Sequence, residues 1–310
     1  MNADNRPVQL VLGFSPGSAS DQIARALGPA LERELGRPIA IELRPGNNGA
    51  DAASEVARAA PDGCTLFMAT LGTHALAPHI VRHLAYDPTR DFAPVSLLTT
   101  SPLVLACHDS LAASSAAELI DLARKRPGEL TYGTSAIGGA PHLAAELFQA
   151  LAGVRMKHVR YAHTERLYDD LEAGRIALSF NNMMSMLPRC TGGSMRALGV
   201  TSGRRNPAAE HLPALAESLP GYEVSNWLGI VAPKATPQPV IDGMREAIAA
   251  ALRDAGVQET LRTAGVTPHG STPDEFADFM AREIARWGPV VASFRDTDAA
   301  PATLTYGDTR

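Results

Sequence analysis

The amino-acid sequence predicts an α/β protein with open, mainly parallel sheets. Stretches rich in apolar and β-branched residues alternate along the chain with stretches whose apolar residues recur at helical spacing. Most connections between two such strands are long enough to hold a helix, and a helical connection joins strands that run parallel. The chain has 310 residues, of which 45% are hydrophobic and 20% are charged, so it can form two domains with ordinary globular cores.

The N-terminal part of the chain shows this alternation most clearly. VQLVLGF, at 8–14, predicts a strand, and Ser18-x-x-Asp21 then resembles a capping box. Apolar residues follow at the spacing of a helix face, and Gly36 ends this helix. The remaining elements of this part are a strand at 38–43, a helix from about 50 to 60 and a strand at 64–70.

The later elements follow the same logic. Strands are expected at 94–107, 130–135, 156–161, 176–182, 195–202 and 227–233. Helices are expected at 115–127, 140–153, 165–174, about 237–255 and 273–294. The tail at 296–310 has no strong pattern, and no internal repeat is visible.

Composition excludes several classes of protein. The net charge is −5 and the basic residues are scattered, which argues against nucleic-acid binding but leaves an anionic small ligand open. No apolar run approaches the ~18 residues of a membrane span. The N-terminus has no signal-peptide pattern, so the protein is either cytosolic or exported with a signal peptide that this sequence lacks. Cys64, Cys107 and Cys190 fit no disulfide framework and no zinc motif; three buried thiols are favoured over one bridge and one free thiol.

The fold class directs attention to four loops. In open parallel sheets, ligands bind beyond the carboxyl ends of the strands, next to helix N-termini. The loops in that position are 14–21, 70–74, 134–141 and 180–185.

The first of these loops matches the nucleophile elbow of serine hydrolases, through Gly13-Phe14-Ser15-Pro16-Gly17. That elbow uses the backbone N–H of the residue after the serine as an oxyanion donor, and Pro16 has none. Losing one such donor costs about 10²–10³ in rate. Catalysis by Ser15 is therefore the disfavoured alternative.

An anion cradle is the favoured interpretation of the same loop. Gly17 allows close approach of the backbone, and the amides of Ser18, Ala19 and Ser20 are expected to be unpaired donors at a positively polarised helix end. Asp21 carries a negative charge of its own, so it either caps the helix or binds an ammonium or hydroxyl group of the ligand.

The chain resembles the Bug-type, or TctC-like, solute-binding receptors of tripartite tricarboxylate transporters. Their opening pattern is PxGGxxD and then AR; its last six positions correspond to Pro16-Gly17-Ser18-Ala19-Ser20-Asp21, and the AR corresponds to Ala24-Arg25. Further stretches that match are RPGNNGADAASEVARAAPDGCTLFMAT, YDPTRDFAPVSLL, LTYGTSAIGGAPHLAAELF, MRALGVTS and WLGIVAPKATP. The resemblance covers residues 6 to 294, and it lies in the order and spacing of these stretches rather than in any one of them.

This resemblance implies a periplasmic-binding-protein-like fold, in which two α/β lobes surround a ligand cleft. Lobe 1 would comprise 1–103 and 228–310 and lobe 2 would comprise 104–227, with crossovers near 101–107 and 224–230. Such a receptor closes on a small carboxylate (a dicarboxylate, an amino acid or an aromatic acid) and delivers it to membrane transporter subunits. It is periplasmic, and it has no catalytic residue, cofactor or metal. A ligand-sensing receptor that feeds a signalling partner would need the same cleft.

The resemblance also implies a set of ligand-binding residues. Lobe 1 would supply Phe14, Ser15, Gly17, Ser18, Ala19, Ser20, Asp21, Thr70, Gly72, Thr73 and His74. Lobe 2 would supply Thr134, Ser135, Gly138, Gly139, Tyr161, Phe180 and Asn181.

The sequence departs from the family pattern in places that bear on the ligand. Ser18 stands where the family has its second glycine, and Arg160-Tyr161-Ala162-His163 replaces a Pro-Tyr-Lys-Gly stretch. Arg160 or His163 either faces a second negative group of the ligand or lies exposed on a loop.

His79 and His83 share a helix spacing, but the sequence provides no third zinc ligand. Trp227 is interpreted as a packing residue at the second crossover, with a ligand wall as the alternative.

Overall fold

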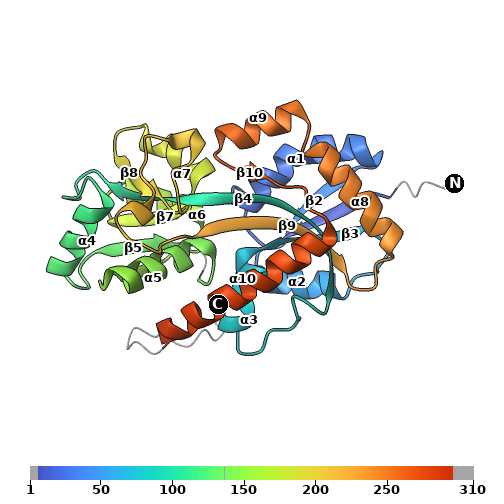
Figure 1. The fold of residues 1–310 in the computed structure, drawn as a ribbon, viewed down its shortest axis with the longest axis horizontal. Helices are drawn as coiled ribbons and strands as arrows, with labels where there is room; N and C mark the ends of the chain where they lie inside the picture. The colour runs from blue at the N-terminus through green and yellow to red at the C-terminus, as the bar shows by residue number, and fades with distance from the viewer. Residues whose placement is uncertain (1–5, 136, 296–310) are drawn as a thin grey trace. The chain divides into compact units, whose positions relative to one another are not determined.

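The structure is a computed structural model that describes residues 6–135 and 137–295 (Figure 1). The chain folds into two compact units. Unit 1 holds the described residues up to Thr99, Trp227–Thr260 and the described residues from Pro268 onward, and unit 2 holds Thr100–Asn226 and Leu261–Thr267. The expected lobes differ from these units at 100–103, 227 and 261–267, since 100–103 and 261–267 were assigned to the first lobe and Trp227 to the second. The tail at 296–310 lies outside the described residues.

Unit 1 is built on a sheet with the strand order β2-β1-β3-β9-β4. Strands β1 (Val8–Leu12), β2 (Ile39–Leu43) and β3 (Thr65–Thr70) pair in parallel, and β9 (Ser225–Pro233) runs antiparallel to β3. Strand β4 (Phe92–His108) is long and continues into unit 2. The predicted alternation of strands and helices up to residue 70 is confirmed.

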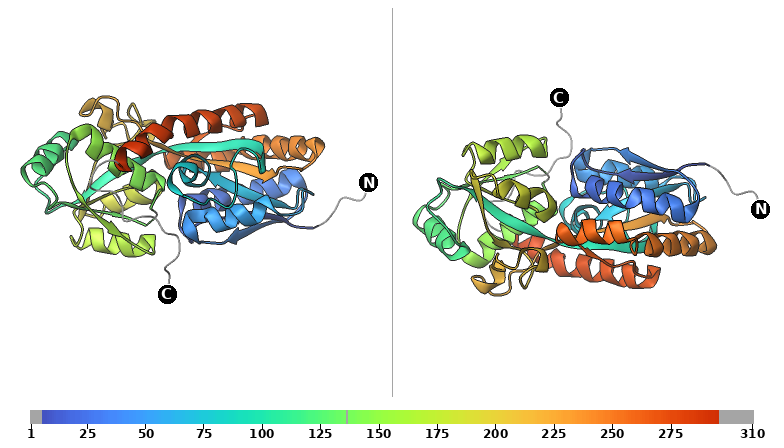
Figure 2. Two further views of the ribbon diagram at one scale, coloured as in Figure 1. Left: turned by 90° about the horizontal axis from the view of Figure 1, so that it is seen from below. Right: turned by 90° about the horizontal axis from the view of Figure 1, so that it is seen from above.

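Helices cover both faces of this sheet. Helices α1 (Ala19–Leu35) and α8 (Gln238–Ala251) pack on each other on one face (Figure 1). Helices α2 (Ala50–Ala57), α3 (Ala77–Ile80) and α10 (Pro273–Arg295) lie on the other face, where α10 packs on α3 and on the π-helical turn Leu71–Leu76 (Figure 2). The bounds of α1 follow its predicted caps, since the Ser18 hydroxyl accepts from the Asp21 amide and Gly36 closes the helix with a φ of 63°.

Unit 2 has a sheet of its own, formed around the second half of β4. Strand β5 (Thr131–Thr134) pairs in parallel with β6 (Lys157–Arg160) and β7 (Leu178–Asn182), whereas β7 and β8 (Met195–Val200) run antiparallel to β4. Helices α4 (Ala116–Lys125) and α5 (Ala140–Ala152) lie on one side of this sheet, and α6 (Thr164–Glu172) and α7 (Met183–Cys190) lie on the other (Figure 1).

The structure corrects the predicted elements at three places. The helix expected at about 237–255 ends at Ala251, because Asp254 caps a separate helix, α9 (Ala255–Thr263), by accepting from the amides of Gly256 and Val257. Helix α7 was not predicted, because Pro188 lies inside it. A two-residue strand, β10 (Thr267–Pro268), pairs with β4. The sheets are also less uniformly parallel than expected, since β9 runs antiparallel to β3, and β7 and β8 run antiparallel to β4.

A buried carboxylate ties α10 to β9 in unit 1. Glu283 Oε2 accepts from the indole N–H of Trp227 at 3.2 Å and from that of Trp287 at 3.0 Å. The Trp227 ring also packs edge-on against Phe276 and Phe279. Trp227 is therefore a packing residue, and its single polar group is satisfied inside unit 1.

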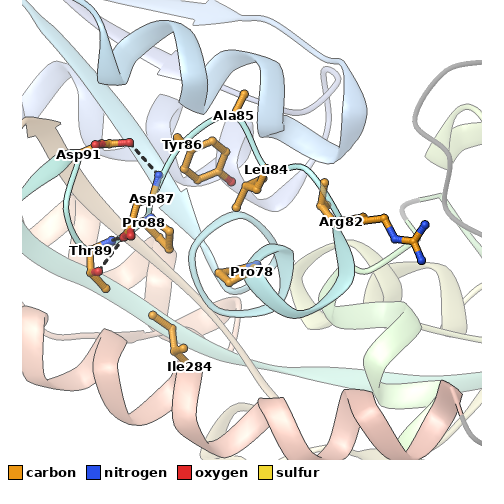
Figure 3. A pocket seen from close by; sticks show the side chains of 11 residues that line it. Pro78, Arg82, Leu84, Ala85, Tyr86, Asp87, Pro88, Thr89, Asp91 and Ile284 are labelled. Carbon is orange, nitrogen blue, oxygen red and sulfur yellow. Dashed lines mark hydrogen bonds between the residues drawn. The ribbon is translucent and has the colours of Figure 1, made fainter.

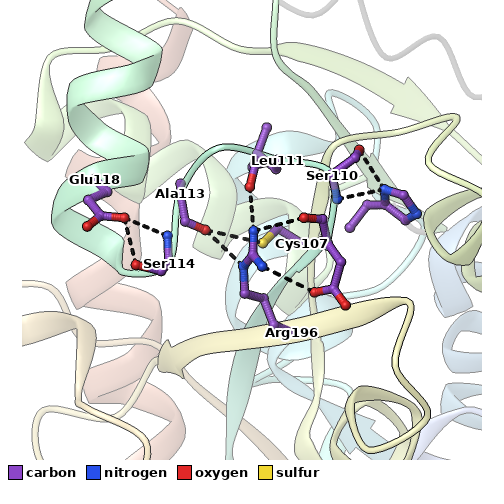
Figure 4. A network of polar contacts seen from close by, with 9 residues as sticks. Cys107, Ser110, Leu111, Ala113, Ser114, Glu118 and Arg196 are labelled. Carbon is purple, nitrogen blue, oxygen red and sulfur yellow. Dashed lines mark hydrogen bonds and ion pairs between the residues drawn. The ribbon is translucent and has the colours of Figure 1, made fainter.

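An arginine organises the loop that follows β4 in unit 2 (Figure 4). Arg196 of β8 donates to the backbone carbonyls of Asp109, Leu111 and Ala113, and it forms an ion pair with the Asp109 side chain. Beneath this network lies Cys107, whose thiol pKa is raised by burial. All three cysteines are free; Cys107 is buried, but Cys64 and Cys190 are only half-buried, so the expectation of three buried thiols holds for one of them.

The contact between β9 and α10 generates a stability prediction. A Cβ atom on Gly229 would lie 2.2 Å from Cζ of the buried Phe276 ring, so Gly229→Ala should destabilise the fold by about 1–3 kcal/mol through overpacking. A matched control is Gly243→Ala in the exposed part of α8, where a Cβ has nothing within 4 Å. The control should stabilise by about 0.5–1 kcal/mol, because alanine favours the helix. Thermal unfolding of both variants is the measurement, and equal shifts would contradict the packing argument.

Candidate ligand-binding loops

Three loops meet at one edge of the sheet in unit 1. Strands β1, β2 and β3 run parallel, so the loops after their carboxyl ends lie side by side. A Cβ on Gly13 would lie 2.4 Å from Cα of Gly49, and a Cβ on Gly49 would lie 2.9 Å from the Thr73 methyl group. Gly49 also has a φ of 85°, so glycine at 13 and 49 is what allows the three loops to touch.

The start of α1 is organised by Asp21, whose side chain is buried. One carboxylate oxygen accepts from the Gly17 amide at 2.9 Å, and the other accepts from Arg25 Nε at 2.7 Å. Of the two roles considered for Asp21, the structure favours the cap. The Arg25 charge offsets the carboxylate charge close to the helix end.

The backbone donors at this helix start are fewer than predicted. The amide of Ser18 donates to the Ser15 carbonyl at 3.2 Å, so its predicted unpaired state is wrong. The reason is that Ser15 to Ser18 forms a tight turn around Gly17, which has a φ of 78°. Within residues 6–135 and 137–295, no hydrogen bond uses the amides of Ala19 and Ser20, so these two remain available to an anion.

The hydroxyl groups of this loop lie close to those amides. Ser18 Oγ and Ser20 Oγ are 3.1 Å apart and share a hydrogen bond. Ser15 and Phe14 are half-buried, and no imidazole of the described chain bonds to Ser15. Together with Pro16, this leaves Ser15 without a general base and without the expected oxyanion donor.

Segment 70–74 runs from the end of β3 into the π-helical turn, and its polar side chains bond within unit 1. Thr70 and Thr73 cap each other reciprocally, and the Tyr86 hydroxyl donates to the Thr73 carbonyl at 2.6 Å. His74 is fully buried, with its Nδ1 3.0 Å from Thr73 Oγ1. Its ring packs against Phe67, Tyr86 and Phe92. Gly72 is buried as well, and this placement favours a structural role for the whole segment.

The corresponding loop in unit 2 joins β5 to α5. Gly138 has a φ of 77°, and its amide donates to His142 Nδ1 at 3.3 Å. Gly139 is the N-cap of α5 and has no side chain to cap it. The turn at 137–138 closes on the Gly139 amide, and in the described chain the Ala140 amide has no hydrogen-bond partner. This helix start therefore presents the Ala140 amide as a free donor, whereas the start of α1 presents two.

A buried polar cluster supports this second loop from below. Thr134 Oγ1 lies 2.7 Å from His158 Nε2, and the His158 ring stacks on Tyr132 at 4.8 Å and lies 4.9 Å from the His142 ring. The Tyr132 hydroxyl donates to Glu146. Burial lowers the pKa of both His142 and His158 to about 4, so both rings are neutral at neutral pH.

The remaining predicted residues of unit 2 make internal contacts. The Ser135 hydroxyl accepts from Thr164 at 3.0 Å, and the Tyr161 hydroxyl donates to Asp170 at 2.9 Å. Burial and this carboxylate raise the pKa of Tyr161 to about 12. Phe180 and Asn181 are buried in β7. Arg160 and His163 lie exposed at the end of β6 and the start of α6.

Unit 1 also contains a hollow away from these loops, with a volume of about 680 Å³ (Figure 3). The segment 78–91 and Ile284 of α10 line it, and none of the predicted ligand-binding residues does. Its Arg82 side chain points away from the hollow (Figure 3). Through Tyr86 the wall of the hollow supports the Thr73 backbone, which gives this region a structural connection to the candidate loops.

Sequence reasoning missed two parts of this arrangement. The loop after β2, with Asn47 and Asn48 at φ values of 43° and 55°, belongs to the same sheet edge as the predicted loops. Its Gly46-Asn47-Asn48-Gly49 composition was the available signal. The sequence also gave no sign that the rings of His142 and His158 lie together, because a ring partner from another element leaves no local pattern.

Comparison with known proteins places the chain in a family. Residues 23–295 match the model of the tripartite tricarboxylate transporter family receptor. The chain belongs to this family of solute-binding receptors, and the predicted resemblance and two-lobed α/β fold class are confirmed. Within the described residues, no helix has the length and apolar character needed to cross a membrane.

Individual relatives are similar along almost their whole length. Protein BugT of Bordetella pertussis is 33% identical over 95% of this chain and 90% of its own length. Among solved structures, R. palustris Rpa4515 with adipate is 37% identical and has a TM-score of 0.89, covering 94% of this chain and 97% of that one. MatC from Rhodopseudomonas palustris with bound malate is 30% identical with a TM-score of 0.86, covering 92% and 99%.

The buried histidines generate a prediction about acid stability. Burial lowers the pKa of His74 from 6.5 to about 3, so between pH 6.5 and 5 the unfolded chain binds a proton that the folded chain does not. The free energy of unfolding should therefore decrease as the pH is lowered from 6.5 to 5, by roughly 2 kcal/mol for one such histidine. His74→Leu removes this contribution, whatever its effect at pH 7. Thermal unfolding from pH 7 to pH 5 should show a shallower decline for the variant, and parallel curves would refute the assignment.

Proposed function

We propose that this protein captures a small carboxylate and delivers it, without chemical change, to the membrane subunits of a tripartite transporter. The carboxylate would be held by backbone amides at the starts of α1 and α5, through closure of the two lobes on one ligand. The observation that carries the proposal is that both helix starts have amides without a partner in the described chain, those of Ala19 and Ser20 at α1 and that of Ala140 at α5. Such amides, at the positive end of a helix, are suited to a carboxylate.

The relatives support the carboxylate class. Two solved structures of proteins 37% and 30% identical to this chain are with adipate and with bound malate. Both ligands are dicarboxylates, and they differ in length and in the presence of a hydroxyl group. We therefore propose a dicarboxylate as the first class to test.

The chemistry of the loops supports binding without catalysis. Pro16 removes the oxyanion donor that a serine nucleophile needs, and Asp21 is engaged by Gly17 and Arg25 rather than by a histidine. Family membership supports a periplasmic location and membrane transporter subunits as partners. A precursor sequence with a signal peptide would test the location directly.

A proline substitution tests the role of the α1 start. Ala19 is the first residue of α1, where proline is well tolerated, and Ser18 before it is already extended, with a ψ of 162°. Ala19→Pro should therefore keep the fold while deleting one free amide. Because a hydrogen bond to a charged group contributes about 1.5–3 kcal/mol, affinity should fall by about tenfold or more. Calorimetry with adipate, L-malate and monocarboxylates on protein freed of retained ligand is the measurement.

The matched control is Ala116→Pro, which places proline at the start of α4 after the extended cap Ser115. It should leave affinity within about twofold of the unsubstituted protein, since this helix start belongs to none of the candidate loops. Absence of binding to every carboxylate would overturn the proposed function. Equal affinity of Ala19→Pro and the unsubstituted chain would remove the α1 start from the site.

A further inference from the structure

The loop before α5 is held by the side chain of His142, which lies four residues after Gly138. Gly139 is the N-cap of α5 but has no side chain, so the usual capping oxygen is missing. His142, the third residue of α5, reaches back and accepts from the Gly138 amide at 3.3 Å. Within residues 6–135 and 137–295, no other side chain bonds to the backbone of 137–139. His142, at the third position of the helix, therefore fixes the residue before the cap, much as the reciprocal partner in a capping box does.

This bond sets the direction of the donors that the proposed function requires. Gly138 has a φ of 77°, a conformation that glycine adopts readily. Because glycine is equally free to leave this conformation, contacts from neighbouring residues are needed to hold it. The turn continues through Gly139, the N-cap of α5, into the free amide of Ala140. Fixing Gly138 therefore fixes where that N–H points.

We propose that His142 is the positioning residue of the α5 carboxylate cradle, and that it acts only as a neutral imidazole whose Nδ1 accepts from Gly138. This inference rests on the proposed function, because it assigns His142 a role only if the α5 start binds the ligand. No direct contact between His142 and the ligand is implied.

The surroundings of the ring fix its tautomer. Since Nδ1 accepts from Gly138, the ring proton lies on Nε2, which faces Glu146 Oε1 at 3.9 Å. The His158 ring lies 4.9 Å away, and the Tyr132 hydroxyl also donates to Glu146. Arg160 acts on His158 through its charge. Burial of His142 lowers its pKa to about 4, so the accepting form dominates at neutral pH.

Protonation of His142 should weaken the cradle rather than strengthen it. An imidazolium has a hydrogen on Nδ1, so two donors would face each other at the Gly138 amide. Its positive charge would attract an anion, but Glu146 lies beside Nε2 and offsets that charge. The lost acceptor has no such compensation. Ligand affinity should therefore decline as the pH approaches 4.

Two substitutions separate positioning from stability. In His142→Asn the amide oxygen replaces Nδ1 as an acceptor at every pH, whereas His142→Leu removes the acceptor. Calorimetry at pH 7 uses whichever of adipate and L-malate binds the unsubstituted protein more tightly. The affinity of His142→Leu for this ligand should be about tenfold lower than that of the unsubstituted protein, and the affinity of His142→Asn should be within about threefold of it. Ser115→Ala, which removes the cap bond of α4, is the control for lost stability alone and should bind normally.

The pH arm gives a readout that a purely structural role would not change. The ratio to measure is the dissociation constant of the unsubstituted protein divided by that of His142→Asn. This ratio should rise at least twofold as the pH is lowered from 6 to 4. Titration of the ligand affects both constants equally and cancels in the ratio. A constant or falling ratio, or equal weakening of the Asn and Leu variants at pH 7, would overturn the role of His142. If the unsubstituted protein bound no carboxylate, the proposed function itself would fail.

Discussion

Parallel strand pairing is the constraint on which the candidate site depends. It brings the loops after β1, β2 and β3 to one edge in unit 1, and it places the β5–α5 loop beside the end of β6 in unit 2. In unit 1 this edge is so crowded that the Gly13 and Gly49 backbones are almost in contact. The donors can then be backbone amides, whose positions are fixed by the sheet rather than by flexible side chains.

This constraint explains how a protein with a net charge of −5 can be suited to an anion without an arginine in its cradle. The one acidic side chain at the α1 start is neutralised locally by Arg25 and by the Gly17 amide. At the α5 start, burial lowers the pKa of His142 and of His158 to about 4, so both imidazoles are neutral at neutral pH. Selectivity for a carboxylate would then come from the directions in which the backbone N–H groups point and from the partial positive charge at the helix N-terminus, both of which act at short range.

The sequence was most informative where the determinant is local. Strand alternation, the Ser18 cap and the Gly36 terminus are short-range features, and the structure contains them. The break before α9 was missed because helical periodicity continues across Asp254, and helix α7 was missed because it contains Pro188. The Ser18 amide was misjudged because a turn to Ser15 competes for it. The clustering of Tyr132, His142 and His158 depends on strand register, which a single sequence does not encode visibly.

The carboxylate of Glu283 has a consequence for optical spectroscopy. The chain has two tryptophans, and both indoles donate to the same oxygen of that carboxylate. The tryptophan emission of the protein therefore originates from one buried microenvironment, where β9 meets α10 in unit 1. A spectral change on adding a solute would report a disturbance of that junction, whereas events confined to the α5 turn would remain optically silent.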